Sequence, residues 1–212
     1  MTAPTPLVVV GTGGHGRETF ELVSAINRAT PTFALLGFLD DDPDANRDRV
    51  RALGTEVLGP VSLLEGMDAR YVLGVGSGEA RRRLDERITA WGGEAAVLVH
   101  PEATVGAEVT LGPGTVVAAG GRVTTNVVLG RHSHLNVNAS VSHDCRVGPY
   151  STVSPGATVS GTVSLGEGVL IGAGATVIQG LSVGGWSTVG AGAVVIRDVP
   201  PGVTAVGVPA RW

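Results

Sequence analysis

The segment LNVNASVSHDCRVGPYSTVSPGATVSGTVSLGEGVLIGAGATV, residues 135–177, carries an aliphatic residue at every sixth position. The same spacing runs without a miss through the longer stretch from Ala103 to Asp198. It matches neither the period of about 3.6 residues of a helix nor the two-residue alternation of a half-buried strand. A hexapeptide period is typical of a parallel β-helix, so this repeat decides the fold. The aliphatic residues are Val105, Leu111, Val117, Val123, Leu129, Leu135, Val141, Val147, Val153, Val159, Leu165, Ile171, Val177, Val183, Val189 and Val195.

Small residues and glycines accompany the repeat. A small residue stands two positions before most of the aliphatic residues, as at Ala139 and Cys145, and glycine often follows them, as at Gly148 and Gly172. The pattern predicts a short strand and then a tight corner, with the aliphatic side chain inward and glycine relieving a positive φ at the corner. If three hexads complete one coil, residues 18 apart stack on the same edge, and residues 199–212 cap the open end.

Composition excludes several classes of protein. The net charge of −4 argues against a nucleic-acid binder that depends on phosphate contacts. The sequence has no run of 18 apolar residues, so no membrane insertion is expected. Residues 1–6 lack the basic segment of a signal peptide, and a cytoplasmic location is expected. The single cysteine, Cys145, lies on the small-residue positions of the repeat, which favours a buried structural thiol over a reactive one.

The first hundred residues follow a different pattern. An aliphatic run at Leu7–Val10 is followed by the glycine-rich turn GTGGHG, residues 11–16, and by helical spacing over residues 17–26. Strand, glycine-rich turn and helix open a mononucleotide-binding unit, in which N–H groups at the helix N-terminus can hold a phosphate. Further strands are expected at residues 33–39, 71–75 and 95–99. The sequence therefore predicts an α/β Rossmann-like domain with a parallel sheet at residues 1–101 and a β-helix domain at residues 102–212.

Two charged clusters in the first domain have more than one interpretation. The acids Asp40–Asp42 follow the second predicted strand, where a carboxylate can accept hydrogen bonds from a ribose or a base. Three carboxylates before a proline can equally mark a solvated turn. The cluster Arg81–Arg83 lies on a helix predicted at residues 79–91 and is expected to form a solvated face rather than a phosphate site.

Three histidines, His132, His134 and His143, fall within the repeat. Three imidazoles could bind zinc, but a separation of 11 residues does not place His132 and His143 on one edge of a coil. Alternatively, His143 is a general base that the adjacent Asp144 orients, since an imidazole accepts a proton near neutral pH. One coil later stands Gly161, whose N–H could donate to a thioester carbonyl oxygen, unless this glycine simply turns a corner.

The segment LNVNASVSHD, residues 135–144, resembles the catalytic coil of the hexapeptide-repeat sugar O/N-acyltransferases. That family includes sialic acid O-acetyltransferases and acetyltransferases of UDP-4-amino sugars. The resemblance extends to the turn at residues 11–16, the acids after the second strand, GVG at 74–76, LVHP at 98–101 and GVPA at 207–210. It implies a left-handed parallel β-helix, acetyl-CoA as co-substrate along the prism edge, no metal, and a homotrimer with active sites between subunits.

The resemblance also implies roles for individual residues. His143 would be the base, Asp144 its acidic neighbour and Gly161 the donor to the thioester oxygen. In the site for the substrate, a UDP-sugar, Gly13, Gly14, His15 and Gly16 would face the phosphates, Asp40 and Asp41 the uridine, and Asn136 the sugar. Gly11 and Gly76 would also bind the substrate. The backbones of Ala173 and Ala191 would bind the pantetheine arm of acetyl-CoA. One departure is Thr152, which stands where some members have a second histidine.

These observations predict an acetyl-CoA-dependent N-acetyltransferase that acts on the amino group of a UDP-linked deoxyamino sugar, with direct attack on the thioester. Three alternatives remain open at this stage. One is O-acetylation of a sugar hydroxyl, as in sialic acid. The others are a non-catalytic nucleotide-sugar-binding trimer and metal hydratase chemistry of the γ-carbonic-anhydrase type.

Overall fold

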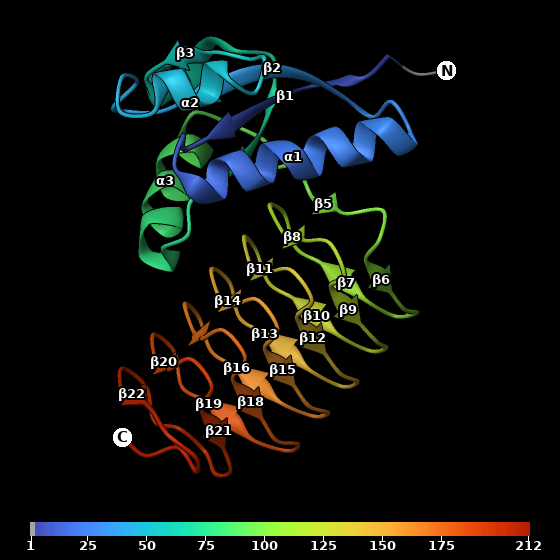
Figure 1. Ribbon diagram of the computed structural model, residues 1–212, viewed down its shortest axis with the longest axis vertical. Coiled ribbons are helices and arrows are strands. Elements are labelled where there is room, and N and C mark those ends of the chain that lie inside the picture. The colour runs from blue at the N-terminus through green and yellow to red at the C-terminus, as the bar shows by residue number, and fades with distance from the viewer. Residues whose placement is uncertain (1–2) are drawn as a thin grey trace. The chain divides into compact units, whose positions relative to one another are not determined.

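The computed structural model describes residues 3–212, so the first two residues of the 1–6 segment lie outside it. The chain divides into a unit that ends at Val97 and a second unit, Leu98–Trp212, which is called the prism below (Figure 1). The prism begins earlier than the boundary expected from the sequence, because Leu98 and Val99 pair with Val116 and Val117 of the next coil.

The first unit is built on a four-stranded parallel sheet in the order β3-β2-β1-β4. Its strands are β1 (Thr5–Val10), β2 (Phe33–Leu39), β3 (Val57–Gly59) and β4 (Arg70–Leu73), and its helices are α1 (Gly14–Ala29), α2 (Arg47–Arg51), the 3₁₀ helix η1 (Val61–Gly66) and α3 (Gly78–Ala90). The run Leu7–Val10 in the central strand is at most 1% exposed, as expected for a parallel strand covered on both faces. Because the strands are parallel, the turns that follow β1, β2 and β4 meet at one edge of the sheet.

Two elements of this unit differ from the sequence-based expectation. Helix α1 begins at Gly14, so the second half of the glycine-rich turn forms the first helical turn. The strand expected at residues 95–99 is divided: Ala95 makes a single bridge to Tyr71, whereas Leu98–Val99 (β5) pairs within the prism. The aliphatic run is continuous in sequence, but its two ends join different sheets.

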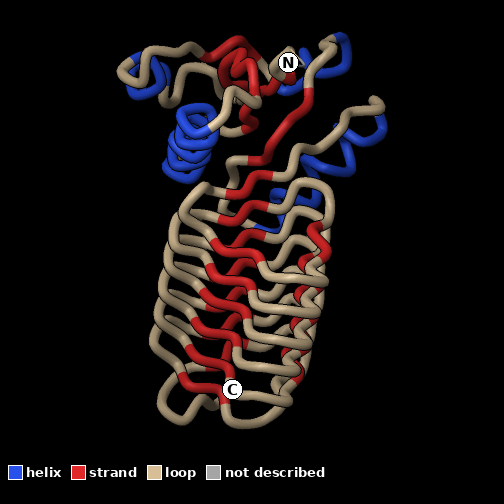
Figure 2. The backbone as a smooth tube through the Cα atoms, turned by 90° about the vertical axis from the view of Figure 1, so that its right-hand side faces the viewer, coloured by secondary structure: helices blue, strands red, loops and turns tan. Residues whose placement is uncertain are grey.

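The prism is a left-handed parallel β-helix whose short strands form three parallel sheets of five, seven and six strands among residues 3–212. Figure 2 shows the stacked coils, with the strands aligned in columns. Strands pair with the strand 18 residues further on, as in Val128 with Arg146, which confirms the predicted coil length. After β5 the strands are β6 (Thr104–Val105), β7 (Thr110–Leu111), β8 (Val116–Val117), β9 (Arg122–Val123), β10 (Val128–Leu129), β11 (His134–Leu135), β12 (Ser140–Val141), β13 (Arg146–Val147), β14 (Thr152–Val153), β15 (Thr158–Val159), β16 (Ser164–Leu165), β17 (Leu170–Ile171), β18 (Thr176–Val177), β19 (Ser182–Val183), β20 (Thr188–Val189), β21 (Val194–Val195) and β22 (Thr204–Ala205).

The predicted aliphatic positions form the core of the prism. From Val117 to Val195 each of them is at most 4% exposed, whereas Val105 in the first coil is 37% exposed. The small residues complete this core: Ala139 and Cys145 are fully buried. Burial raises the pKa of the Cys145 thiol, which agrees with a structural rather than a reactive cysteine.

The glycines that follow the aliphatic residues have a different role from the one expected. Gly148 and Gly172 do not have a positive φ. A β-carbon on Gly148 would lie 2.5 Å from the carbonyl carbon of Gly166, and one on Gly172 would lie 2.6 Å from the nitrogen of Ala191. These glycines are therefore required by the close approach of neighbouring coils. The left-handed residues come two positions later, and many are not glycine; Tyr150, for example, has a φ of 58°.

Candidate functional site

His143 occupies the corner between β12 and β13, with its side chain 59% exposed. Its Nδ1 lies 2.7 Å from Oδ2 of Asp144. The coil register stacks Gly161 against the ring: a β-carbon at Gly161 would lie 2.5 Å from both Cε1 and Nε2 of His143. Only glycine leaves room for the imidazole in this position, so the 18-residue spacing does bring the two predicted residues together.

Asp144 is held in a fixed orientation by residues of the preceding coil. Its φ is 59°, and its N–H donates to the carbonyl of Thr125 at 3.2 Å. Its Oδ1 accepts a hydrogen bond of 2.6 Å from Nδ2 of Asn126, one coil earlier. The hydrogen bonds to His143 and Asn126 hold the pKa of Asp144 below its ordinary value. An ionised carboxylate only accepts, so Nδ1 of His143 is the donor in this bond, and in the neutral form of the ring the lone pair is on Nε2.

Asn126 was not among the residues expected from the sequence. The signal was available, because 144 − 18 = 126 places Asn126 directly beside Asp144 in the coil register. An asparagine is also one of the few non-glycine residues that readily adopts the left-handed conformation seen here, with a φ of 52°.

Three backbone N–H groups expected to bind acetyl-CoA have no hydrogen-bond acceptor within residues 3–212: those of Gly161, Ala173 and Ala191. The carbonyls of Gly161 and Ala173, by contrast, accept the N–H groups of Gly180 and Gly192. Ala173 and Ala191 are exposed, whereas Gly161 is buried beneath the His143 ring. At Gly161 and Ala173 the corner therefore presents a donor, while its carbonyl is already engaged.

The glycines at the edge of the first sheet fall into two groups. Gly11, Gly16 and Gly74 interlock: a β-carbon at Gly16 would collide with the carbonyl oxygen of Gly11, and one at Gly74 would lie 2.5 Å from Cα of Gly16. Gly13, Gly14 and Gly76 meet nothing within 4 Å, and none of them has a positive φ. Neither packing nor backbone conformation within the chain requires glycine at these three exposed positions. Their lack of side chains suits the close approach of a ligand.

The acids after β2 are engaged within the chain. Oδ2 of Asp40 accepts the N–H of Thr12 at 2.8 Å and the hydroxyl of Thr12 at 2.7 Å. Asp41 accepts the N–H of Val61 at 3.1 Å and pairs with Arg87 at 2.8 Å. Both acids therefore anchor turns at the sheet edge, which is a role that neither sequence interpretation included.

His15 and Arg81 add charge at the same edge. Nδ1 of His15 lies 3.4 Å from Oε2 of Glu18. Burial lowers the pKa of His15, and the positive charge of Arg81 acts in the same direction. Arg81 is fully buried, so the expectation that Arg81–Arg83 form a solvated face is wrong for this residue. Its guanidinium reaches the sheet edge, where it donates to carbonyls of the turn after β4.

The remaining polar residues of interest lie inside the prism. Asn136 donates through Nδ2 to the carbonyl of Val153 at 3.3 Å. His134 pairs in register with Thr152, and both are buried. The ring of His132 is buried and stacks on Tyr150 with a centroid distance of 6.1 Å. No group of three or more potential ligands that could hold a metal occurs among residues 3–212.

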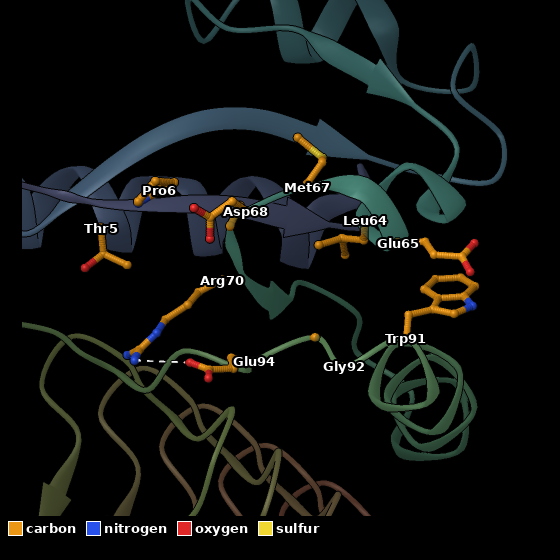
Figure 3. Close-up of a pocket in the computed structure, with 12 residues that line it drawn as sticks. Thr5, Pro6, Leu64, Glu65, Met67, Asp68, Arg70, Trp91, Gly92 and Glu94 are labelled. Atoms are coloured by element: carbon orange, nitrogen blue, oxygen red, sulfur yellow. Dashed lines mark ion pairs between the residues drawn. The ribbon is translucent and has the colours of Figure 1, made fainter.

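One cavity, of about 310 Å³, lies in the first unit at the opposite end of the sheet from the glycine turns (Figure 3). It is lined by residues at the starts of β1 and β4, including Pro6 and Arg70, and by Trp91 after α3. Arg70 pairs with Glu94 across it at 3.3 Å. None of the predicted site residues lines this cavity. Within the described part of the chain, no helix is long and apolar enough to cross a membrane.

Known proteins resemble this chain in sequence and in fold. The model of the PglD N-terminal domain matches residues 6–88. The GDP-perosamine N-acetyltransferase of Escherichia coli O157:H7 is 31% identical over 138 residues, which are 64% of this chain and 61% of that protein. The chain thus spans less than two thirds of this curated relative.

Solved structures match almost the whole chain. The acetyltransferase domain of PglB from Neisseria gonorrhoeae FA1090 is 37% identical, with a TM-score of 0.88 over 97% of this chain and 98% of that one. PerB from Caulobacter crescentus, solved with CoA and GDP-perosamine, is 32% identical, with a TM-score of 0.88 over 97% of this chain and 96% of that one. The sequence identity and the matched fold show that the chain belongs to the hexapeptide-repeat sugar acyltransferase family.

Proposed function

We propose that the protein is an acetyl-CoA-dependent N-acetyltransferase that acts on the amino group of a nucleotide-linked deoxyamino sugar. The observation that carries the proposal is the chain of hydrogen bonds from Asn126 to Asp144 to His143, which leaves Nε2 of this exposed side chain available as a base. The nucleotide-sugar ligand in the matched Caulobacter structure and the name of the E. coli relative support an amino-sugar acceptor.

In the proposed reaction the sugar amine attacks the thioester carbonyl carbon directly, and Nε2 of His143 takes a proton from the nitrogen as the new C–N bond forms. The C–S bond then breaks, and the CoA sulfur leaves and receives the proton from His143. A backbone N–H, that of Gly161, would stabilise the oxyanion at the edge of the imidazole. No acyl-enzyme is needed, which fits the buried position of Cys145.

The substrates would be held by two sets of backbone groups. The exposed N–H groups of Ala173 and Ala191 would bind the pantetheine arm of acetyl-CoA. The open turn at Gly13, Gly14 and His15, with Gly76, would receive the nucleotide diphosphate at the N-terminus of α1. Because Asp40 and Asp41 are already engaged, their contribution to a uridine would be to fix the shape of the turns. Asn136 would face the sugar.

The exposed state of His143 in the single chain fits an active site completed by a second copy, and we propose a homotrimer. Sedimentation would give the mass of about three chains, and a monomer that is fully active would contradict this part of the proposal.

A thiol-release assay tests the function. Wild-type protein would be offered acetyl-CoA with a UDP-4-amino-4,6-dideoxy sugar, with GDP-perosamine, or with free sialic acid, and the products would be identified by mass spectrometry. Formation of an N-acetylated nucleotide sugar is expected. If only sialic acid were acetylated, the protein would be an O-acetyltransferase and not an N-acetyltransferase. If no acceptor led to thiol release, the proposed acetyltransferase activity would be wrong.

A further inference from the structure

Arg81 is the largest fully buried side chain among residues 3–212. Its neighbours on α3 are exposed. The side chain of Arg82 is 44% exposed, and its Nε lies 3.9 Å from Oε1 of Glu86. The side chain of Arg83 is 68% exposed, and its Nη1 lies 3.9 Å from Oε2 of Glu79. Burial lowers the pKa of Arg81 to about 10, so the guanidinium remains charged at neutral pH. Burying a charge is costly unless hydrogen bonds compensate for it, so its partners indicate what the charge does.

Two of those partners are carbonyls of one turn. Nη1 of Arg81 donates to the oxygen of Val75 at 3.0 Å and to the oxygen of Gly76 at 2.8 Å. Gly76 is one of the three glycines at this edge of the sheet where a β-carbon would meet nothing within 4 Å, and the turn that contains it packs through Gly74 against Gly16. A carbonyl oxygen repels a phosphate, so a turn that faces an anion must direct its carbonyls elsewhere. Arg81 draws two of them into the protein.

The charge of Arg81 also reaches the neighbouring turn. It lowers the pKa of His15, after the larger effect of burial, and Glu18 is the group that opposes both. His15 belongs to the first turn of α1, where helix N–H groups favour an anion. On that same turn Arg17 donates through Nη1 to the carbonyl of Thr12 at 2.8 Å. Guanidinium groups therefore hold carbonyls of both turns.

We propose that Arg81 is a positioning residue for the nucleotide diphosphate. It holds the Val75 and Gly76 carbonyls away from the open glycines and places a permanent positive charge beneath the two turns. It acts through the turn and not by touching the phosphates, because its side chain is wholly covered. The inference rests on the proposed function, since it requires a nucleotide-linked acceptor.

The test compares the full-length wild type with Arg81→Met, Arg81→Lys and the matched control Arg82→Met. Calorimetry would give the dissociation constants of UDP and of GDP, and steady-state kinetics would give kcat and both KM values. Loss of charge-assisted hydrogen bonds should weaken nucleotide binding about tenfold to hundredfold in Arg81→Met. The KM for the nucleotide sugar should rise in parallel, with kcat and the KM for acetyl-CoA within about twofold of wild type. Arg81→Lys should be intermediate, since a lysine keeps the charge but not the planar fork.

A second readout separates positioning from general stability. Without the nearby cation the pKa of His15 should rise in Arg81→Met, which an NMR titration of the ring detects, whereas Arg82→Met should leave it unchanged. Nucleotide dissociation constants that are unchanged in a folded Arg81→Met, or in Arg81→Lys if Arg81→Met does not fold, would overturn the inference while leaving the proposed function intact. A wild type that neither binds nor acetylates any nucleotide sugar would overturn both.

Discussion

The prism and the first unit both use glycine to allow close approach, but the approaching group differs. In the prism it is part of the same chain: the backbone of the next coil at Gly148, or the His143 ring at Gly161. At the edge of the first sheet, by contrast, a β-carbon on Gly13, Gly14 or Gly76 would meet nothing within 4 Å, and none of these three glycines has a positive φ. The difference suggests a division of labour, in which the prism presents a base already held in place and the first unit leaves a surface open to the acceptor. Changes in the prism should therefore alter turnover, and changes at the open glycines should alter acceptor binding.

The largest effect is expected from His143→Ala, which removes the proposed base. General-base catalysis contributes about 10² to 10⁴ in rate, so kcat should fall by that factor while the KM for the nucleotide sugar changes little. Steady-state kinetics measures both constants. His100→Ala serves as the control, since His100 lies at the start of the prism and its side chain accepts the N–H of Glu102. If the kcat of His143→Ala stayed within a few-fold of wild type, His143 would not be the general base.

Gly161→Ala tests whether the ring must lie against the neighbouring coil. The new β-carbon would come within 2.5 Å of Cε1 and Nε2 of His143, so the imidazole must shift. A displacement of this kind at a reacting group costs about 10²-fold, and kcat should fall accordingly without loss of acceptor binding. Gly66→Ala is the matched control, because a β-carbon there meets nothing within 4 Å. A rise in the acceptor KM with kcat preserved would reverse the proposed division of labour.

The two groups of glycines in the first unit should separate binding from stability. Gly14→Ala places a methyl group in open space at the start of α1, so the acceptor KM should rise about tenfold while the melting temperature is maintained or rises slightly. Gly16→Ala forces a collision with the carbonyl of Gly11 and should destabilise the fold by about 1–3 kcal/mol. Kinetics and thermal unfolding of the two variants measure these effects. Equal losses of stability would mean that both glycines serve internal packing.

The smallest effect is expected from Asn126→Ala. Loss of its bond to Asp144 loosens the carboxylate that orients His143, and kcat should fall a few-fold. The pKa of Asp144, which is lowered first by His143 and then by Asn126, should rise toward its ordinary value. Any stability that comes from this lowered pKa is present at neutral pH and is lost as the pH falls through the folded-state value. An NMR titration of the carboxyl would show the rise, and an unchanged pKa would contradict this role for Asn126.

Much of the prism could be predicted because its structure is periodic. A fixed hexad sets which side chains face inward, and the 18-residue coil sets which residues touch, as for His143 and Gly161. The reason for the glycines after the aliphatic residues was not predictable from the period, because it depends on how closely neighbouring backbones approach. The contact of Asn126 with Asp144 follows from the same register, but two polar residues at a corner do not by themselves reveal a hydrogen bond.

The first unit was less predictable because its contacts are not periodic. The strand, glycine turn and helix were recognisable from local sequence, but whether an arginine on α3 is buried depends on the rotation of the helix against the sheet. Three consecutive arginines occupy positions 81–83, but only the side chain of Arg81 is buried. Likewise, the hydrogen bond from Thr12 to Asp40 connects two turns whose residues are 28 positions apart in the sequence, and no local pattern indicates it.

The coil register also governs which changes in length the prism can tolerate. Inserting or deleting one coil beyond Gly161 would return every later corner to its original edge, since strands there pair at 18-residue spacing, as Thr176 does with Val194. Inserting or deleting one hexad would keep every aliphatic residue inward but move each later corner onto the next edge. Ala173 and Ala191 would then move together to a different edge of the prism. Natural or engineered length variants should therefore differ by multiples of a coil and not of a hexad.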